Sequence, residues 1–190
     1  MKPTLCADDV RDSMPLFRSG RGGLKPTSAL QLFVRESGMR RAQELNRLWH
    51  SVLPETHLGN LVGKPKSVAY IAEVGQIAYA VAIWTTPIAA NRLSDGWNAL
   101  ELRRLAIADD APKNTATRML AVMVRMIRGK WPTLNRLISY QAEQHHKGTI
   151  YAAAGWRLAS RSESSAWHVD EQRDIRQTKS AVLRWELSLC

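Results

Sequence analysis

The stretch LELRRLAI, residues 100–107, decides the fold. Its first two leucines point to one face of a strand, whereas its third leucine and its isoleucine have the opposite parity. One extra residue near Arg103-Arg104 would restore the alternation, and an extra residue in a strand is a β-bulge. We therefore predict a bulged strand with one arginine directed inward, where a buried arginine normally has an anionic partner.

The segment after this strand predicts a helix whose start faces an anion. DDAPKN (109–114) is followed by an apolar stripe at helical spacing: Ala116, Met119, Leu120, Met123 and Ile127. A bulge splays a strand from its neighbour, and a helix N-terminus presents N–H groups and partial positive charge. Together they predict a slot for a pantetheine arm and a pyrophosphate, with the phosphate end lined by Asn114, Thr115, Thr117 and Arg118. In the alternative interpretation, Asn114 or Thr115 only caps a core helix.

The remaining patterns predict a further helix, a hairpin and a mixed α/β order. From Gly38 to Pro54 an apolar helical face is formed by Leu45, Leu48, Trp49, Val52 and Leu53. Two strand-like runs, 68–74 and 77–84, flank Gly75-Gln76 as in a hairpin. Residues 136–140 and 181–189 are predicted strands, with a helix between them that ends at Gly155. The expected fold class is α/β, a mixed central sheet flanked by helices.

Length and charge bound the organisation and the partners. The 190 residues fit one domain over 27–190, preceded by an irregular basic arm over 1–26. The formal charge of +10 and the pI of about 10.1 favour a polyanionic partner, most commonly nucleic acid. Two cysteines, near opposite ends, indicate neither a disulfide framework nor a zinc site. This cysteine usage predicts a reducing, cytoplasmic setting. No apolar run approaches the roughly 18 residues of a membrane span.

The stretch SYQAEQHHKGTIYAAAGW, 139–156, gathers the candidate chemistry. Glu143 beside His145-His146 suggests a metal site, but adjacent histidines diverge on regular elements and no third ligand stands at a recognisable spacing. Tyr151 is predicted on a helix just after a buried strand, where a phenol can protonate a leaving group or stabilise charge. The alternatives are a tyrosine packed between helix and sheet, and, for His50, an ordinary helix-end residue.

This architecture resembles the GNAT (GCN5-related N-acyltransferase) fold, with its bulged fourth strand and cofactor-binding helix. Four words in order, LELRRLAI, APKNTATRML, LISYQ and HKGTIYAAAGW, resemble the Mom family of bacteriophage DNA-modification enzymes. The resemblance is dense over 100–156 and extends to LNRLWHSVLP at 45–54. It implies addition of a carbamoylmethyl (acetamido-type) group to the exocyclic N6 of adenine in phage DNA inside a bacterial host, which protects that DNA from restriction. It also implies acetyl-CoA or another acyl donor.

The resemblance assigns roles to individual positions. His50 matches the histidine after the first helix, Arg104 the arginine of the bulged strand, and Tyr151 the tyrosine of the GTIY word. Thr117 matches the small hydroxyl residue of the cofactor helix, and Tyr140 is placed with the cofactor site. We expect the double-stranded DNA to contact the basic side chains Arg40, Arg41, Arg47 and Lys147.

Two departures from the family pattern keep alternatives open. Related sequences carry an aspartate after the SY pair, where this chain has Ala142 followed by Glu143, so either Glu143 substitutes or a catalytic carboxylate is missing. The glycine-rich pyrophosphate loop of typical GNAT enzymes is replaced by DDAPKNTA, whose two aspartates would repel an anionic cofactor unless they point away. The competing interpretations are an ordinary GNAT acetyltransferase acting on a protein or small amine, and a catalytically inactive DNA-binding relative.

A base inside a duplex cannot reach such a slot, so the adenine must be flipped out. A tryptophan can stack on the flipped base or fill the space it leaves. Trp49, Trp84 and Trp97 are the candidates, with a place in the core as the alternative for each.

Overall fold

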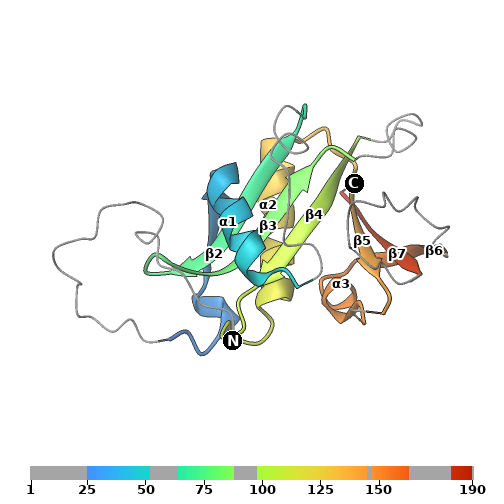
Figure 1. The fold of residues 1–190 in the computed structure, drawn as a ribbon. Coiled ribbons are helices and arrows are strands. Elements are labelled where there is room, and N and C mark those ends of the chain that lie inside the picture. Colours follow the sequence, from blue (N-terminus) through green and yellow to red (C-terminus); the bar gives the residue numbers. More distant parts are fainter. Residues whose placement is uncertain (1–24, 52–63, 88–97, 145–146, 163–180, 190) are drawn as a thin grey trace, which may run out of the picture.

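In the computed structural model, which describes residues 25–51, 64–87, 98–144, 147–162 and 181–189, seven strands form one mixed sheet in the order β1-β2-β3-β4-β5-β7-β6 (Figure 1). The strands are β1 (Phe33–Ser37), β2 (Ser67–Val74), β3 (Ile77–Thr85), β4 (Ala99–Ile107), β5 (Arg136–Ala142), β6 (Arg157–Ser162) and β7 (Val182–Ser188). The helices are the short 3-10 helix η2 (Ala29–Gln31), α1 (Met39–Trp49), α2 (Thr115–Lys130) and α3 (Thr149–Ala153). The predicted α/β class with a mixed sheet and flanking helices is confirmed.

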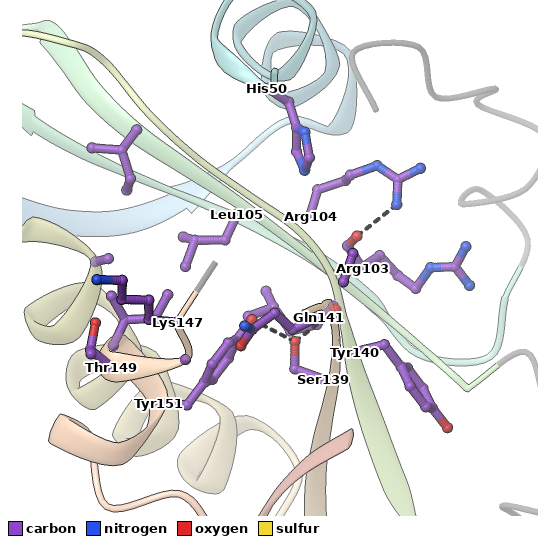
Figure 2. Close-up of a pocket in the computed structure, with 16 residues that line it drawn as sticks. His50, Arg103, Arg104, Leu105, Ser139, Tyr140, Gln141, Lys147, Thr149 and Tyr151 are labelled. Atoms are coloured by element: carbon purple, nitrogen blue, oxygen red, sulfur yellow. Dashed lines mark hydrogen bonds between the residues drawn. The ribbon is translucent and has the colours of Figure 1, made fainter. Parts of the chain in front are cut away.

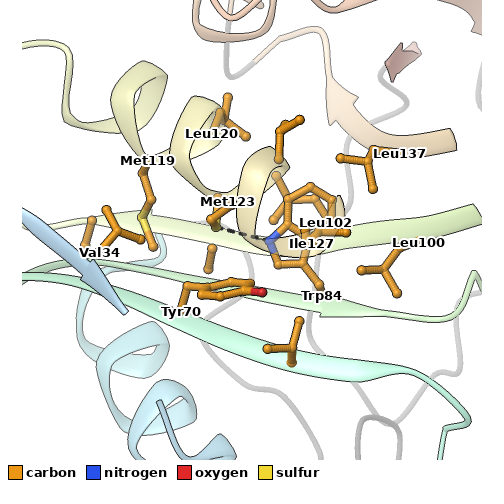
Figure 3. Close-up of a cluster of buried hydrophobic side chains, with 14 of the residues drawn as sticks. Val34, Tyr70, Trp84, Leu100, Leu102, Met119, Leu120, Met123, Ile127 and Leu137 are labelled. Carbon is orange, nitrogen blue, oxygen red and sulfur yellow. Dashed lines mark hydrogen bonds between the residues drawn. The ribbon is translucent and has the colours of Figure 1, made fainter. Parts of the chain in front are cut away.

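The two faces of the sheet bury separate apolar clusters. On one face, Leu45 and Trp49 of α1 pack on Ile71 of β2 and on Val81 and Ile83 of β3. On the other face, α2 covers the sheet with its predicted stripe, and the large buried side chains there are Tyr70, Trp84, Leu100, Met119, Leu120, Met123, Ile127 and Leu137 (Figure 3). The strands between the two helices are therefore apolar on both sides, as the continuous runs in β2 and β3 indicated.

The hairpin and the bulge are confirmed at the predicted residues. β2 and β3 pair antiparallel around Gly75 and Gln76, both of which have positive φ. Between β3 and β4, Ile83 pairs with Arg104 and Trp84 with Leu102, which leaves Arg103 as the extra residue. The bulge restores the alternation that the sequence of β4 breaks, so apolar side chains stay buried on both sides of it.

The strands β4 and β5 separate just beyond the bulge. They pair in parallel from Ala99–Arg136 to Leu102–Ser139, and no pairing continues although β4 extends to Ile107 and β5 to Ala142. On its other edge β5 pairs with β7 along its whole length, from Arg136 to Ala142. The fork therefore leaves the edge of β4 that faces β5 without a strand partner beyond Leu102 among the described residues, as we predicted from the bulge.

Three sequence expectations need correction. The strands β1 and β6 were not predicted: β1 is only five residues long, and β6 is an exposed edge strand without apolar alternation. The first helix ends at Trp49, well before Pro54, because His50 already has an extended backbone. At the start of α2, Asn114 occupies the cap position with φ of 66°, outside the extended conformation that side-chain capping requires, and it makes no capping hydrogen bond. Thr115 does not cap either, since its hydroxyl donates to the Pro112 carbonyl at 2.7 Å.

Several predictions fall outside the described residues. These are most of the basic arm, the end of the first apolar face at Val52–Pro54, the histidine pair 145–146 and Trp97. Within the described part of the chain, no helix is long and apolar enough to cross a membrane.

Candidate active site

A cavity of about 350 Å³ occupies the fork between β4 and β5 (Figure 2). Its walls come from the end of α1, the bulged half of β4, the start of α2, β5 and the start of α3. The lining residues are His50, Leu102, Arg103, Arg104, Leu105, Ile107, Ala116, Ser139, Tyr140, Gln141, Ala142, Lys147, Gly148, Thr149, Ile150 and Tyr151. The volume lies in the range of small-molecule sites, ~300–1,000 Å³. The structure thus brings His50, Arg104, Tyr140, Ala142, Lys147 and Tyr151 together, from positions far apart in the sequence.

The phenol of Tyr151 is held rigidly in this cavity. Its hydroxyl lies 2.8 Å from Oγ of Ser139, and its ring stacks on Trp185 at 5.4 Å and meets the edge of Trp156 at 5.6 Å. Tyr151 comes from α3 and Ser139 from the last residue of β5 that pairs with β4. The polar tip of the ring is therefore fixed at the point where the fork opens.

The environment of Tyr151 keeps the phenol protonated. Burial raises the pKa of the Tyr151 hydroxyl above its ordinary value, and the hydrogen bond with Ser139 offsets this shift only in part. A phenol with a raised pKa stays protonated at neutral pH, so it can donate a hydrogen bond, although it is a weaker acid than an ordinary tyrosine. The geometry favours donation by Tyr151 rather than proton removal.

Arg104 approaches the same cavity from the α1 face of the sheet. Its Nη1 donates to the carbonyl of Arg103 at 2.7 Å, while its Nε is buried without a hydrogen-bond partner. Burial, followed by the charge of Arg103, lowers the pKa of Arg104 to about 10, so the guanidinium remains charged at neutral pH. The expected anionic partner belongs instead to Arg103, whose Nε lies 3.4 Å from Glu101. Arg104 thus keeps a buried donor without a hydrogen-bond partner among the described residues, while its side chain lines the cavity.

His50 reaches the cavity because α1 ends there. Its backbone N–H donates to the Asn46 carbonyl at 2.8 Å, which closes the last turn and leaves the imidazole beyond the helix end. Figure 2 shows His50 and Arg104 together above the strands and Tyr151 below them. The cavity is therefore lined from both faces of the sheet.

Gly148 is required where α3 begins. Its φ is +71°, and a Cβ built on it would lie 2.3 Å from the Trp185 ring and 3.0 Å from Oε1 of Gln141. That same Oε1 accepts a hydrogen bond from Nε1 of Trp185 at 3.0 Å. The glycine lets the loop carrying Lys147 and Thr149 approach the sheet closely, which places both side chains on the cavity wall.

Sequence reasoning missed Ser139 and Gln141, which line the cavity on β5. The signal was present, because both share a face with the buried Leu137 and polar residues at buried strand positions need partners. Ser139 is 1% and Gln141 5% exposed, and both have polar partners in the structure.

The start of α2 lies at the cavity, but the residues expected at a phosphate do not line it. Ala116 is on the wall, whereas Asn114, Thr115, Thr117 and Arg118 are outside it. The backbone N–H groups in the first turn still point out of the helix end, as in any α-helix. Asp110 lies 3.7 Å from Lys25, which offsets one of the two aspartates.

The fork fits the extended arm of an acyl thioester. The edge of β4 beyond Leu102 has no strand partner on the cavity side among the described residues, and such an edge can hydrogen-bond an amide-containing chain. The side chains expected around a pyrophosphate fit less well, since the exposed Asn114 and the buried Thr115 are both off the wall.

The structure places Glu143, the candidate substitute for the family aspartate, outside the cavity. Ala142 lines the cavity, but Glu143 is exposed and accepts from Arg161 at 2.8 Å. This pairing also lowers the pKa of Glu143. No Asp or Glu is present among the described residues that line the cavity. Across the described ranges, no three His, Cys, Asp or Glu side chains are grouped as a metal site requires.

The basic residues expected at DNA differ in their surroundings. Arg40 and Arg47 are exposed on α1, and Lys147 is exposed at the cavity wall. Arg41 is half-buried, and its Nη2 lies 3.6 Å from Glu73, so part of its charge is used within the fold.

Solved structures with this fold are acetyltransferases. A Bacillus subtilis acetyltransferase in complex with CoA matches with a TM-score of 0.60 and 12% identity, covering 84% of this chain and 99% of that one. The Escherichia coli ribosomal-protein-S18-alanine N-acetyltransferase matches with 0.60 and 10%, covering 83% and 93%. Spermidine N-acetyltransferase from Vibrio cholerae, in complex with CoA and spermine, matches with 0.59 and 13%, covering 84% and 96%. At these identities the likeness shows the GNAT fold.

The family follows from the sequence match. No curated protein sequence matches the chain. The family model described as the Mom protein family matches residues 74–186, which is more than half of the chain. The matched segment contains the bulged strand β4, the fork and Tyr151, and with its GNAT fold the chain belongs to the Mom protein family.

Proposed function

We propose that this chain adds a carbamoylmethyl group to the exocyclic N6 of adenine in phage DNA and so protects that DNA from host restriction. The proposal is supported by membership of the Mom family together with one observation: the fork cavity is lined by a buried, protonated phenol, Tyr151, from the α2 side of the sheet and by a charged arginine, Arg104, from the α1 side. An acceptor amine and an activated carbon can meet in such a cavity.

The chemistry requires a base, a donor and close placement. The N6 lone pair of adenine is delocalised into the purine ring, so the new N–C bond forms only as an N6 proton leaves. In this proposal His50 accepts that proton, because an imidazole titrates near neutral pH. Tyr151 donates its proton to the leaving group as the leaving group takes the electrons of the broken bond. Ser139 holds the phenol in position. Arg104, which lines the cavity and stays charged at neutral pH, offers its guanidinium to a carbonyl or anionic oxygen of the transferred group.

The donor would lie in the fork, along the unpaired edge of β4 and against Ala116 and Lys147. An acyl-CoA would transfer its carbonyl carbon with thiolate as the leaving group and give an N6-acyl amide. A carbamoylmethyl group is joined to N6 through its CH2 carbon, so its donor must carry a leaving group on that CH2 and must itself supply the amide nitrogen. Acetyl transfer alone would give N6-acetyladenine, because a carbamoylmethyl group contains one NH unit more than an acetyl group. The product therefore reports the donor class.

DNA would be held by its backbone while the adenine is flipped out. The net charge of +10, with the exposed Arg40 and Arg47 on α1 and Lys147 at the cavity, supports contacts with phosphates. Flipping costs a few kcal/mol, which the phosphate and base contacts must offset.

Mass spectrometry of nucleosides tests the proposal. DNA from cells that express the chain should contain adenosine bearing the carbamoylmethyl group, and DNA from cells with the empty vector should not. N6-acetyladenosine would indicate acetyl transfer instead. Unmodified adenine, together with acetylation of a protein or polyamine, would support the ordinary acetyltransferase.

A second candidate, a DNA-binding protein without catalysis, is favoured by one observation. The family aspartate is replaced by Ala142, and no carboxylate is present among the described cavity-lining residues. If the wild type leaves adenine unmodified and Ala142→Asp modifies it, this chain is the inactive relative. Equal modification by both chains would show that the position needs no carboxylate.

A further inference from the structure

Tyr140 is an exposed aromatic residue at the cavity wall. Among the described residues the exposed large hydrophobic side chains are Leu30, Phe33, Tyr140 and Leu158. Of these, Tyr140 lines the cavity, and it is 38% exposed, whereas Tyr151 is 7% exposed. An exposed ring at the mouth of a cavity contributes little to the core and is available to a ligand.

Strand alternation places Tyr140 on the opposite face from Ser139 and Tyr151. Ile138 of β5 pairs with Glu101 of β4 just before the fork opens. Glu101 in turn pairs with Thr85 of β3, which shares its face with Ile83. Ile83 packs against α1, so Tyr140, two residues beyond Ile138, also faces the α1 side. Figure 2 shows Tyr140 and Tyr151 projecting to opposite sides of β5.

The α1 side of the cavity also carries His50, assigned to the acceptor amine, and Arg104, assigned to the transferred group. Arg104 pairs with Ile83 and lies on this face, and His50 follows α1. The tryptophans expected to stack on a base are elsewhere: Trp49 is 2% and Trp84 0% exposed, both within the core, and Trp97 lies outside the described residues. Tyr140 is thus the accessible aromatic ring on the described part of the α1-side wall.

We propose that Tyr140 is a stacking platform for the flipped adenine. This inference rests on the proposed function and replaces the expected role of Tyr140 in cofactor binding. A flipped base loses its neighbours in the duplex and is commonly held between aromatic or apolar side chains. Every base has a π-face, so stacking supplies affinity, while hydrogen bonds to the base edge supply preference for adenine. Tyr140 is a positioning residue and takes no part in proton transfer.

Binding to two matched duplexes tests this site. One duplex carries a single adenine opposite an abasic site, so that the base is already unpaired, and the other has abasic sites in both strands. At fixed salt, measured by fluorescence anisotropy, the wild type should bind the adenine duplex about tenfold more tightly. Tyr140→Phe should keep this preference, and Tyr140→Leu, which keeps apolar bulk without a ring, should lose most of it.

The controls separate stacking from folding and from catalysis. Leu158→Ala, at an exposed residue of β6, should leave the preference unchanged, and melting curves of all variants should coincide within a few degrees. Equal preference in the wild type and Tyr140→Leu would overturn the stacking site, as would a wild type without preference. Nucleoside mass spectrometry tests the modification separately. Preference for the adenine duplex together with unmodified cellular DNA would support the stacking site and contradict the proposed modification. Modified cellular DNA without this preference would contradict the stacking site alone.

Discussion

The hydroxyl of Tyr151 lies 2.8 Å from Oγ of Ser139, at the residue of β5 where pairing with β4 ends. The contact joins the helix α3 to the apex of the fork. It places the polar tip of a buried ring where two strands separate, and the ring is packed on both sides by Trp156 and Trp185. The separation of β4 and β5 and the position of the candidate acid, Tyr151, therefore depend on the same contact.

Loss of the Ser139 hydroxyl should reduce modification without unfolding the chain. In Ser139→Ala the Tyr151 hydroxyl loses its partner, so we expect about tenfold less modified adenine and a loss of about 1 kcal/mol in unfolding free energy. Nucleoside mass spectrometry and urea unfolding measure the two effects. Ser37→Ala, at a serine outside the cavity whose hydroxyl contacts only the Gly38 carbonyl at 3.4 Å, is the matched control and should change neither. Wild-type modification in Ser139→Ala would contradict a positioning role.

Tyr151 should not titrate with the accessible tyrosines. Because burial raises its pKa above the ordinary 10.0, the folded state retains this proton after the unfolded state has lost it, and the fold loses stability as the pH rises past 10.0. Tyrosinate absorbance measured against pH should therefore coincide for the wild type and Tyr151→Phe until the chain unfolds. An additional tyrosinate in the folded wild type near pH 10.0 would contradict the buried, protonated phenol.

The buried charge of Arg104 should lower the free energy of unfolding. Burial lowers its pKa to about 10, so above pH 10 the unfolded state holds this proton more tightly, and the contribution of Arg104 to stability rises with pH while that of the buried Tyr151 falls. At neutral pH, Arg104→Met should therefore increase the free energy of unfolding by about 1 kcal/mol and raise the melting temperature. The amount of modified adenine should fall by at least tenfold. Arg125→Met, on the exposed side of α2, is the matched control. A strongly destabilised Arg104→Met would show that the guanidinium has a structural partner.

Gly148→Ala should be strongly destabilising, and Gly129→Ala should not. At Gly148 a Cβ would overlap the Trp185 ring and the backbone φ is positive, which together cost about 2–4 kcal/mol. Gly129, near the end of α2, has open space around its Cβ position, so alanine there should be neutral or stabilise by up to about 1 kcal/mol. Thermal unfolding of the two variants measures the contrast. Equal melting temperatures would mean that the α3 loop moves away from Trp185 at little cost.

The sequence was sufficient for the features that obey a strong local period. The broken alternation in LELRRLAI predicted both the bulge at Arg103 and the fork, because an extra residue changes the face of every later side chain. The stripe of α2 and the hairpin at Gly75-Gln76 were equally readable. The presence of Tyr151 beside the fork followed from these elements and from the family words.

The features that failed depend on tertiary contacts. β6 exists because it pairs with β7 at the sheet edge, and its exposed RLASRS sequence has no alternation of its own. The positive φ of Asn114 removed a cap that its residue type predicts. Binding of a phosphate by Asn114, Thr115, Thr117 and Arg118 stays a prediction. These residues lie off the cavity wall, since spacing gives the face of a helix but not how far its first turn stands from the fork.

One measurement tests the central claim most directly: nucleosides of DNA from cells expressing the wild type and Tyr151→Phe, with salt-dependent DNA binding measured on both purified proteins. We predict carbamoylmethylated adenine from the wild type and none from Tyr151→Phe, with equal affinity and equal salt slope for the two. Undiminished modification by Tyr151→Phe would contradict the assignment of the fork and its phenol as the active site.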